Sequence, residues 1–397
     1  MSAAPPAPAG ALVELAARAR ETRRLALDTE FMGEGRYRVL LCLVQLATPQ
    51  TAESTERIEL LDPLERDISG APLASILADP EVEVVVHAGR QDVALVRRRF
   101  ACEVRNVFDT QVAAGFAGLG AQTSYETLLA ELLGVRIAKS ASFTRWDTRP
   151  LTAEQRAYAR EDVVHLLELA AELERRLIAL GRLQWAREEC EPLESASDER
   201  DPRVVFARLP RVRTLSATAR PIARELVQWR ERAAARADRP VQSILSDPAL
   251  LEIARRKPSS RAELEQIRGA GGGGVRRRAQ ELIEAVERAR GRPPEPPSEA
   301  VRGPLARPED APLIALAEAL VRTHALRAGI AYELIASRAD LQAIVTARRT
   351  GEREPDVRTL RGWRRELVGE ELLHLLEGHV SLSVVGGGLE IGRRSRP

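Results

Sequence analysis

The chain changes character near residue 190. Before that point, short apolar runs alternate with stretches of helical periodicity, and the runs lie at 24–29, 39–47, 58–61 and 82–87. Short strands that are each followed by a helix are typical of a mixed α/β layer. From residue 214 to 290 the pattern is helical throughout, and a second helical stretch follows from 311 to 380. The sequence therefore predicts one α/β domain followed by all-α domains.

Polar and proline-rich stretches divide the chain further. The linker signals are an acidic segment at 191–203 and the run Gly-Arg-Pro-Pro-Glu-Pro-Pro at 291–297. The two helical segments have similar lengths but share no clean repeat period. The predicted organisation is a disordered tail at 1–10, an α/β domain at 11–190, a linker at 191–213, a helical domain at 214–290, a Pro-rich linker at 291–304, a second helical domain at 305–380 and a tail at 381–397.

Composition excludes several classes of protein. No apolar run approaches the ~20 residues of a membrane span, and the N-terminal residues Met-Ser-Ala-Ala-Pro-Pro lack the pattern of a secretory signal. The three cysteines, Cys42, Cys102 and Cys190, are too far apart for a disulfide framework or a zinc knuckle. We therefore expect a cytoplasmic protein. Without a heptad seam or an obvious apolar interface, we expect a monomer.

The net charge of +2 conceals two regions of opposite sign. Residues 21–170 carry 17 basic and 23 acidic side chains, whereas residues 211–290 carry 18 basic and 10 acidic ones. An acidic domain suits metal ions, and a basic domain suits a polyanion. The alternative is that the charges only solvate helices.

Acidic side chains follow two of the predicted strands. Asp28 and Glu30 lie two apart at the end of an apolar strand, so the alternation of a strand directs both to one face. Asp92 follows the strand at 82–87 and falls in the first turn of the next helix. The carboxyl ends of strands are where α/β proteins form their sites. Each motif alone also fits a strand that runs into solvent or an Asp at a helix N-terminus.

Tyr158 and Asp162 are four residues apart, so on a helix they share one face. The alternative for this pair is a buried tyrosine that hydrogen-bonds a surface carboxylate. Together, Asp28, Glu30, Asp92 and Asp162 supply the hard oxygen ligands that two divalent cations, Mg²⁺ or Mn²⁺, require. Such a site suits hydrolysis of a phosphodiester, and Tyr158 would orient the attacking water.

Three motifs resemble those of the DEDD exonuclease superfamily in its tyrosine-containing branch, at residues 27–31, 87–92 and 158–162. Residues 41–47 and 149–151 narrow the resemblance to the ribonuclease D family. The helical segments resemble HRDC domains, the helicase-and-ribonuclease-D C-terminal module, and residues 360–367 look like the end of that family's second such unit. The resemblance spans about residues 11–380.

This resemblance implies a ribonuclease-H-like exonuclease domain followed by two HRDC-type domains. It implies a 3′–5′ exoribonuclease that trims tRNA precursors and other structured RNAs and releases nucleoside 5′-monophosphates. Asp28, Glu30, Asp92 and Asp162 match the family's metal ligands, and Tyr158 matches its water-positioning tyrosine. The chain departs from the family at Arg145, where an Asp is usual, in its short segment before Arg24, and in the loose glycine turn at 269–274.

Several further side chains are candidates for contacts with RNA. Phe31 could stack on a terminal base, and His87 could contact a phosphate or only satisfy the backbone. The densest basic clusters of the helical domain are candidate phosphate ligands; they consist of Arg255, Arg256, Lys257, Arg276, Arg277 and Arg278.

Two other functions remain open from the sequence. The first is a DNA 3′–5′ exonuclease, because the choice of sugar depends on contacts to the 2′-hydroxyl rather than on the metal site. The second is a non-catalytic RNA-binding adaptor that uses only the helical domains. A helicase motor is excluded, because the chain has no phosphate-binding loop of the Gly-x-x-x-x-Gly-Lys-[Ser/Thr] type.

Overall fold

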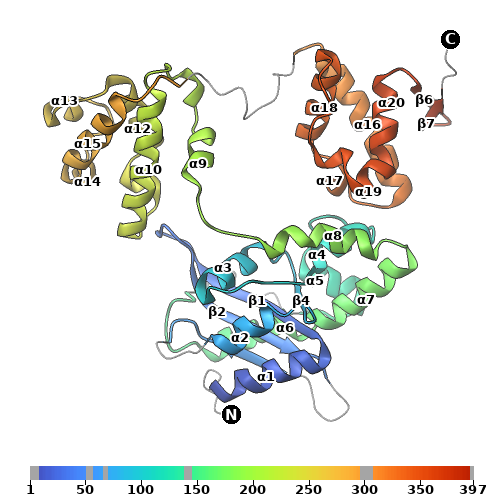
Figure 1. Ribbon diagram of the computed structural model, residues 1–397. Coiled ribbons are helices and arrows are strands. Elements are labelled where there is room, and N and C mark those ends of the chain that lie inside the picture. Colours follow the sequence, from blue (N-terminus) through green and yellow to red (C-terminus); the bar gives the residue numbers. More distant parts are fainter. Residues whose placement is uncertain (1–8, 51–56, 66–69, 138–144, 296–306, 394–397) are drawn as a thin grey trace. The chain divides into compact units, whose positions relative to one another are not determined.

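The computed structural model describes residues 9–50, 57–65, 70–137, 145–295 and 307–393. Parts of the predicted tails and of the Pro-rich linker, at 1–8, 296–304 and 394–397, lie outside these ranges. The chain divides into two compact units (Figure 1). Unit 1 comprises residues 1–30, 41–197 and 303–397, and unit 2 comprises residues 31–40 and 198–302. Among the helices of the described ranges, none combines the length and apolar character of a membrane span.

A five-stranded mixed sheet forms the centre of the N-terminal part of unit 1. Its strand order is β3-β2-β1-β4-β5, with β1 parallel to β4, β4 parallel to β5, and β2 antiparallel to β3. Buried Val, Leu and Ala side chains fill these strands, as expected for a sheet covered on both faces. The strands are β1 Arg24–Met32, β2 Leu40–Thr48, β3 Arg57–Leu61, β4 Glu83–Val86 and β5 Val107–Asp109.

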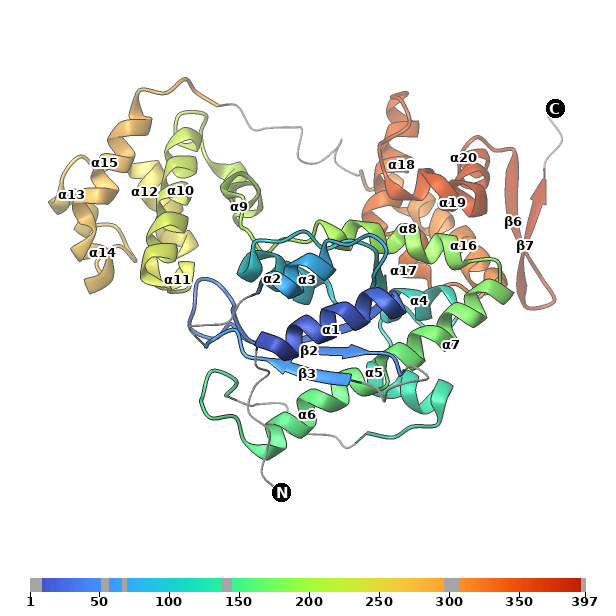
Figure 2. The same ribbon diagram turned by 60° about the horizontal axis from the view of Figure 1, so that its bottom comes forward.

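Helices cover this sheet on both faces, and Figure 2 shows α1 lying along β2 and β3. Helix α1 also packs against α2, while α6 contacts β3 and α7 contacts β4. The helical pattern at 152–178 is divided in two, because the backbone leaves helical geometry at His165. The elements are α1 Ala9–Thr22, α2 Ala71–Leu77, α3 Arg90–Phe100, α4 Thr110–Phe116, α5 Tyr125–Leu128, η1 Leu129–Leu133, α6 Ala153–Val164, α7 Leu166–Ala179 and α8 Leu183–Glu194.

The last ninety or so residues form a helical domain and a hairpin that belong to the same unit. Two paired strands occupy most of the predicted tail at 381–397. Gly386 and Gly387 adopt positive φ angles of 58° and 82°, which is how a two-residue turn joins two antiparallel strands. The elements are α16 Asp310–Ala328, α17 Tyr332–Ile335, α18 Arg338–Thr350, η4 Arg358–Leu360, α19 Gly362–Arg364, η5 Arg365–Gly369, α20 Glu370–Leu376, β6 Val380–Val385 and β7 Gly388–Arg393.

One continuous apolar core joins this C-terminal domain to the sheet domain. The indole of Trp363 stacks on Trp185 at 5.3 Å between ring centroids and meets Phe116 edge-on at 5.0 Å. The backbone also takes part, since the Ala331 N–H donates to the Gly115 carbonyl at 3.1 Å. A β-carbon at Gly115 would lie 2.7 Å from a methyl group of Leu334, so a larger residue here would require the Leu334 side chain to move.

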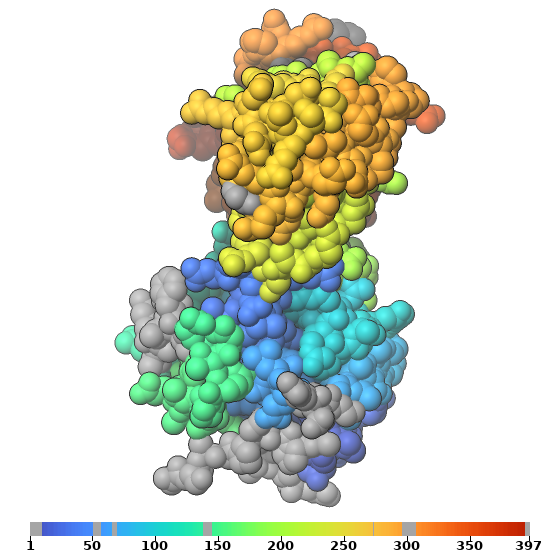
Figure 3. Space-filling model, turned by 90° about the vertical axis from the view of Figure 1, so that its left-hand side faces the viewer, coloured from blue at the N-terminus to red at the C-terminus, as the bar shows by residue number. Residues whose placement is uncertain are grey.

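Unit 2 has a separate core built from helices α9 to α15. Its visible face in Figure 3 is formed mostly by the later helices, drawn yellow to orange. The predicted linker at 191–213 is mostly ordered helix, because α8 extends to Glu194 and Asp201 caps α9 by accepting from the Arg203 N–H. The elements are α9 Pro202–Arg208, η2 Val212–Thr214, α10 Arg220–Ala237, α11 Val241–Ile244, α12 Asp247–Arg256, α13 Arg261–Glu265, α14 Gly273–Arg277 and α15 Ala279–Arg290.

Trp363→Ala is expected to destabilise unit 1 by about 3–5 kcal/mol, because it removes a buried indole that packs on two other aromatic rings. Thermal unfolding followed by circular dichroism measures the loss. Leu326→Ala is the control, since Leu326 is 84% exposed and its removal should change stability by less than about 0.5 kcal/mol. Equal melting temperatures for the two variants would contradict the packing role of Trp363.

Candidate active site

Asp28 and Glu30 lie near the carboxyl end of β1, in the middle of the sheet. Burial raises the pKa of Asp28 well above its ordinary range, and the charges of Asp92, Asp162 and Glu30 raise it further. Burial raises the pKa of Glu30 to about 8, with additional repulsion from Asp162 and Asp92. The predicted juxtaposition of the two carboxylates on one strand is therefore present.

Asp92 and Asp162 approach the same place from two helices. Asp92 lies in the first turn of α3, is 7% exposed, and accepts a hydrogen bond from the Thr29 hydroxyl. Burial raises its pKa to about 6, although that hydrogen bond opposes the shift. Asp162 lies on α6, where burial, then the charges of Glu126 and Glu161, raise its pKa to about 7. All four predicted carboxylates thus form one repelling cluster.

The donor set of this cluster fits divalent cations. Within the described ranges, no three His, Cys, Asp or Glu side chains have converged into a ready metal site. However, four half-buried or buried carboxylates form an unfavourable arrangement, in which Asp28 and Glu30 have pKa values raised further by their neighbours, and bound cations would relieve it. Hard cations take carboxylate oxygens in preference to other protein ligands. The residues that could hold a metal here are therefore Asp28, Glu30, Asp92 and Asp162.

A buried carboxylate outside the predicted set holds the turn that carries Asp92. Asp109, at the end of β5, is 2% exposed. Its side chain accepts hydrogen bonds from the backbone N–H groups of Ala88 at 3.0 Å and Gly89 at 2.9 Å. It also accepts from Gln111 at 2.8 Å and so caps α4. Asp109 therefore fixes the start of α3 relative to the sheet.

Asp109 was not among the predicted site residues, although the sequence contains a signal for it. Phe108-Asp109-Thr110 repeats the pattern of Leu27-Asp28-Thr29, an apolar residue followed by Asp and Thr at the end of a buried strand. The strand β5 is only three residues long, so it shows no periodicity of its own. Glu126, whose charge acts on both Asp162 and His87, carried no recognisable signal.

The predicted tyrosine lies one turn before Asp162 on α6. The ring of Tyr158 packs against Trp146, with 6.0 Å between the ring centroids. The segment that carries Trp146 is held by Arg149, which donates to the Cys42 carbonyl at 2.7 Å and pairs with the buried Asp62. Arg145 pairs instead with Asp147 at 2.9 Å. Arg149 thus anchors this segment, although an Asp is absent at position 145.

The predicted nucleic-acid contacts have different surroundings. Phe31 is 39% exposed beside Glu30 on β1. His87 lies with Nδ1 2.9 Å from the Thr110 hydroxyl, and burial lowers its pKa. Both observations on His87 favour a structural role for this side chain.

The predicted basic clusters of unit 2 are largely engaged with other groups. Glu252 pairs with both Arg255 and Arg256, at 3.5 and 2.7 Å. Lys257 donates to Thr218 at 2.9 Å, and Arg276 lies 3.8 Å from Glu265. The two remaining members of the clusters are Arg277 and Arg278. Arg278 donates to the Gly274 carbonyl, whereas Arg277 is exposed and makes no ion pair with a described residue.

Comparison with family models identifies two segments of the chain. Residues 8–178 match a 3′–5′ exonuclease model, and residues 219–286 match an HRDC domain model. The second of these lies wholly inside unit 2. The C-terminal helices lie outside both matched segments, so a count of two HRDC domains does not follow from this comparison.

Curated relatives match along nearly the whole chain. A ribonuclease D from Granulibacter bethesdensis is 38% identical over 94% of this chain and 93% of its own length. One from Gluconacetobacter diazotrophicus is 36% identical over 93% of this chain and 91% of its own. The crystal structure of Escherichia coli ribonuclease D matches with a TM-score of 0.80 at 28% identity, covering 96% of this chain and all of that one.

In the absence of divalent cations, we expect stability to fall as the pH rises from about 4 to 8. The folded state raises the pKa of Asp92 to about 6, of Asp162 to about 7 and of Glu30 to about 8. The folded protein therefore binds more protons than the unfolded chain in this range. The contribution of each of these carboxyl groups to stability is fully present below its unfolded pKa, and it is lost as the pH rises through its folded pKa.

Melting temperatures measured in EDTA at pH 5 and pH 8 test this expectation. Each kcal/mol lost corresponds to about 2–4 °C for a domain of this size. Asp28→Asn should show a smaller fall, because it removes one charge of the cluster, and Mg²⁺ should restore the wild-type melting temperature at pH 8. A melting temperature that rises with pH in EDTA would contradict the clustered arrangement.

Asp109→Ala is expected to lower the free energy of unfolding by roughly 2–4 kcal/mol, because it leaves one buried and two partly buried backbone N–H groups without an acceptor. Urea denaturation measures the change. Ser124→Ala is the matched control: Ser124 caps the exposed start of α5, and its loss should cost about 1 kcal/mol. Equal effects of the two substitutions would show that Asp109 has no special role.

Proposed function

Because this chain belongs to the ribonuclease D family of 3′–5′ exoribonucleases, we propose that Asp28, Glu30, Asp92 and Asp162 are the metal ligands of its active site. The family implies divalent metal ions, and we propose that they are two and are Mg²⁺ or Mn²⁺. The observation that carries this proposal is the cluster of four carboxylates with raised pKa values at the carboxyl edge of the sheet. Such a cluster suits two cations that share ligands.

The reaction is hydrolysis of the terminal phosphodiester of RNA. Water adds to phosphorus, the 3′-oxygen of the penultimate nucleotide leaves, and a nucleoside 5′-monophosphate is released. Divalent cations in such sites activate the water and stabilise the leaving oxygen. We assign to Tyr158 the orientation of the water, since it lies one helical turn from Asp162 and its ring is held by Trp146. Thr29 and Asp109 fix the position of Asp92.

The substrate that we propose is a tRNA precursor or another structured RNA with an unpaired 3′ tail. The Escherichia coli ribonuclease D is described as an exoribonuclease involved in structured RNA processing. Phe31 is exposed beside Glu30 and could stack on the terminal base. The clusters Arg255–Lys257 and Arg276–Arg278 add positive charge to unit 2, although several members are already paired.

We also propose that the C-terminal helices are a second HRDC-type domain, at about 305–380, beside the first at 214–290 and the exonuclease domain at 11–190. The support is an internal structural repeat. Long helices α10 and α16 each end in a left-handed residue, Asp238 and Gly329. Four-residue helices α11 and α17 follow, then one extended residue, and then Ser246 or Ser337 immediately before α12 or α18.

A monomeric, cytoplasmic enzyme is our proposal for the state and location of the protein. An RNA substrate of the tRNA type occurs in the cytoplasm. Cys42, Cys102 and Cys190 are all free thiols, which suits a reducing compartment.

Metal-dependent shortening from the 3′ end tests the proposed site. A 5′-labelled RNA hairpin with an unpaired 3′ tail should shorten with Mg²⁺ or Mn²⁺ and remain intact in EDTA. Asp28→Ala should abolish shortening while RNA binding persists. Tyr158→Phe should lower kcat by roughly 10²-fold or more with little change in KM, because it alters only the orientation of water.

A matched DNA hairpin is the control for the substrate. Faster shortening of the DNA would favour the DNA exonuclease. Retained binding without shortening of either strand would favour the non-catalytic adaptor. Full activity of Asp28→Ala would contradict the assigned ligands.

A further inference from the structure

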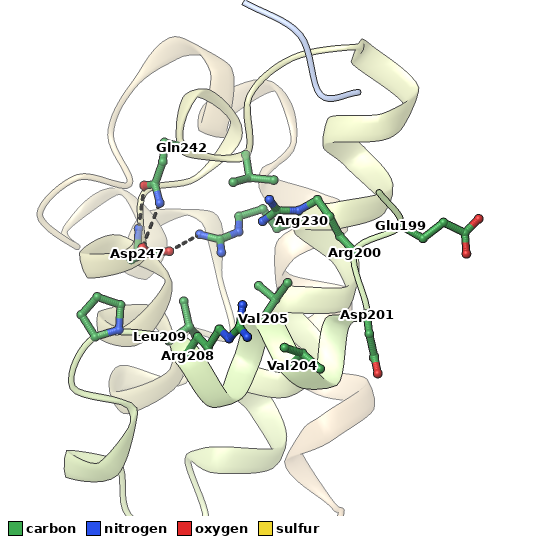
Figure 4. A pocket seen from close by; sticks show the side chains of 12 residues that line it. Glu199, Arg200, Asp201, Val204, Val205, Arg208, Leu209, Arg230, Gln242 and Asp247 are labelled. Carbon is green, nitrogen blue, oxygen red and sulfur yellow. Dashed lines mark hydrogen bonds and ion pairs between the residues drawn. The ribbon is translucent and has the colours of Figure 1, made fainter. Parts of the chain in front are cut away.

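Unit 2 contains a pocket of about 430 Å³ beside helix α9. Figure 4 shows Val204, Val205 and Arg208 on this helix, with Arg230 on the other side reaching toward Asp247. A pocket of this size is at the lower end of those that bind small ligands, and it could accommodate one nucleoside. None of its lining residues belongs to the carboxylate cluster.

The floor of the pocket is apolar, and its wall contains a buried arginine. Val205 and Leu209 are half-buried or buried against the core of unit 2. Arg230 is 1% exposed; it donates to the Leu245 carbonyl at 3.0 Å and to Asp247 at 2.6 Å. Its Nε has no hydrogen-bond partner within the described residues. The pocket thus offers an apolar surface for a planar group and one buried N–H without an acceptor.

A strip of arginine side chains that form no ion pair with a described residue borders this pocket. Most arginines of unit 2 pair with carboxylates, for example Arg200 with Glu231 at 2.8 Å and Arg292 with Glu225 at 2.8 Å. Four of the described exceptions lie on α9 and the turn after it, while Arg239, Arg268 and Arg277 lie elsewhere in unit 2. The four arginines on α9 and in this turn are exposed and make no side-chain hydrogen bond or ion pair with any described residue; they are Arg203, Arg208, Arg211 and Arg213.

The strip and the pocket are contiguous. Arg208 lines the pocket, and Arg211 directly follows the lining residue Pro210. Three carboxylates line this pocket: Asp247 pairs with Arg230, Asp201 caps the N-terminal end of α9, and Glu199 extends away from Arg230 in Figure 4. The C-terminal end of α9 is therefore the basic end.

We propose that the arginine strip and the pocket form an RNA-binding site that is separate from the active site. Phosphates of a single-stranded segment lie on Arg208, Arg211 and Arg213, and one unpaired base enters the pocket against Val205. The choice of RNA rests on the proposed function, and charge complementarity supports it, since exposed arginines without carboxylate partners attract a polyanion. The basic clusters at 255–257 and 276–278 are mostly paired and contribute less.

Charge removal tests the strip. The triple variant Arg208→Gln, Arg211→Gln, Arg213→Gln should weaken binding of a tailed RNA hairpin by roughly tenfold to hundredfold at 0.1 M salt, and should reduce the slope of log Kd against log salt by about 2. The matched control removes three arginines that are already paired, through Arg255→Gln, Arg256→Gln and Arg276→Gln. The control should weaken binding much less. Equal losses of RNA affinity in the two variants would contradict the proposed role of the strip.

Filling the cavity tests the pocket. Val205→Phe should lower RNA affinity by about tenfold without changing the salt slope, because it excludes the base but no phosphate. A 2-aminopurine base in the unpaired tail should change its fluorescence on binding to the wild-type protein and not to this variant. Val204→Phe serves if Val205→Phe fails to fold, since Val204 is 44% exposed. An unchanged fluorescence response in a folded variant would contradict the proposal that a base enters the pocket.

A short substrate separates this site from the active site. A dinucleotide, whose single phosphodiester must lie in the active site to be cleaved, should be hydrolysed equally by the wild-type protein, the strip variant and the pocket variant. Absence of hydrolysis by the wild-type protein would refute the proposed function. The binding measurements would still show whether the strip binds RNA. Loss of short-substrate hydrolysis in the strip variant alone would overturn the separation of the two sites.

Discussion

Four carboxylates that repel one another are held at one edge of a buried sheet, and much of the surrounding structure serves to keep them there. Asp28 and Glu30 are placed by the central strand, and burial makes their charged forms costly. A protein gains nothing in stability from such a cluster. The divalent cations that we propose for this site would offset that cost.

Two side chains hold these groups in position: Asp109 through hydrogen bonds, and Arg149 through an ion pair and a hydrogen bond. Asp109 binds backbone N–H groups of the turn before α3, and so sets the height of Asp92 above the sheet. Arg149 joins Asp62 and the Cys42 carbonyl, and so holds the segment on which Tyr158 rests. Both anchors connect the end of a strand with a later segment. The proposed active site therefore depends on contacts between residues far apart in the sequence.

The sequence was sufficient for those features that have a local pattern. Strand ends with carboxylates, the Tyr158–Asp162 spacing and the helical domains were predictable, because each follows from a period of two or four residues. The strand β5 was too short to show a period, and α9 was hidden by charge and proline. The pairing of Arg200 with Glu231, 31 residues away, has no local signal. By contrast, the i,i+4 pairing of Arg256 with Glu252 was readable, and it reduces the weight of that basic cluster.

Trp185 and Trp363 stack on each other although 178 positions separate them, and the whole of residues 198–302 lies between them in the chain. During synthesis, the sheet domain leaves the ribosome first, followed by an independently cored helical unit. The apolar face around Phe116 and Trp185 therefore remains exposed until the last ninety or so residues, which cover it, have been synthesised. During this interval the face of the nascent nuclease is open to chaperones or to a neighbouring chain, and the core is completed only when the segment that carries Trp363 has emerged.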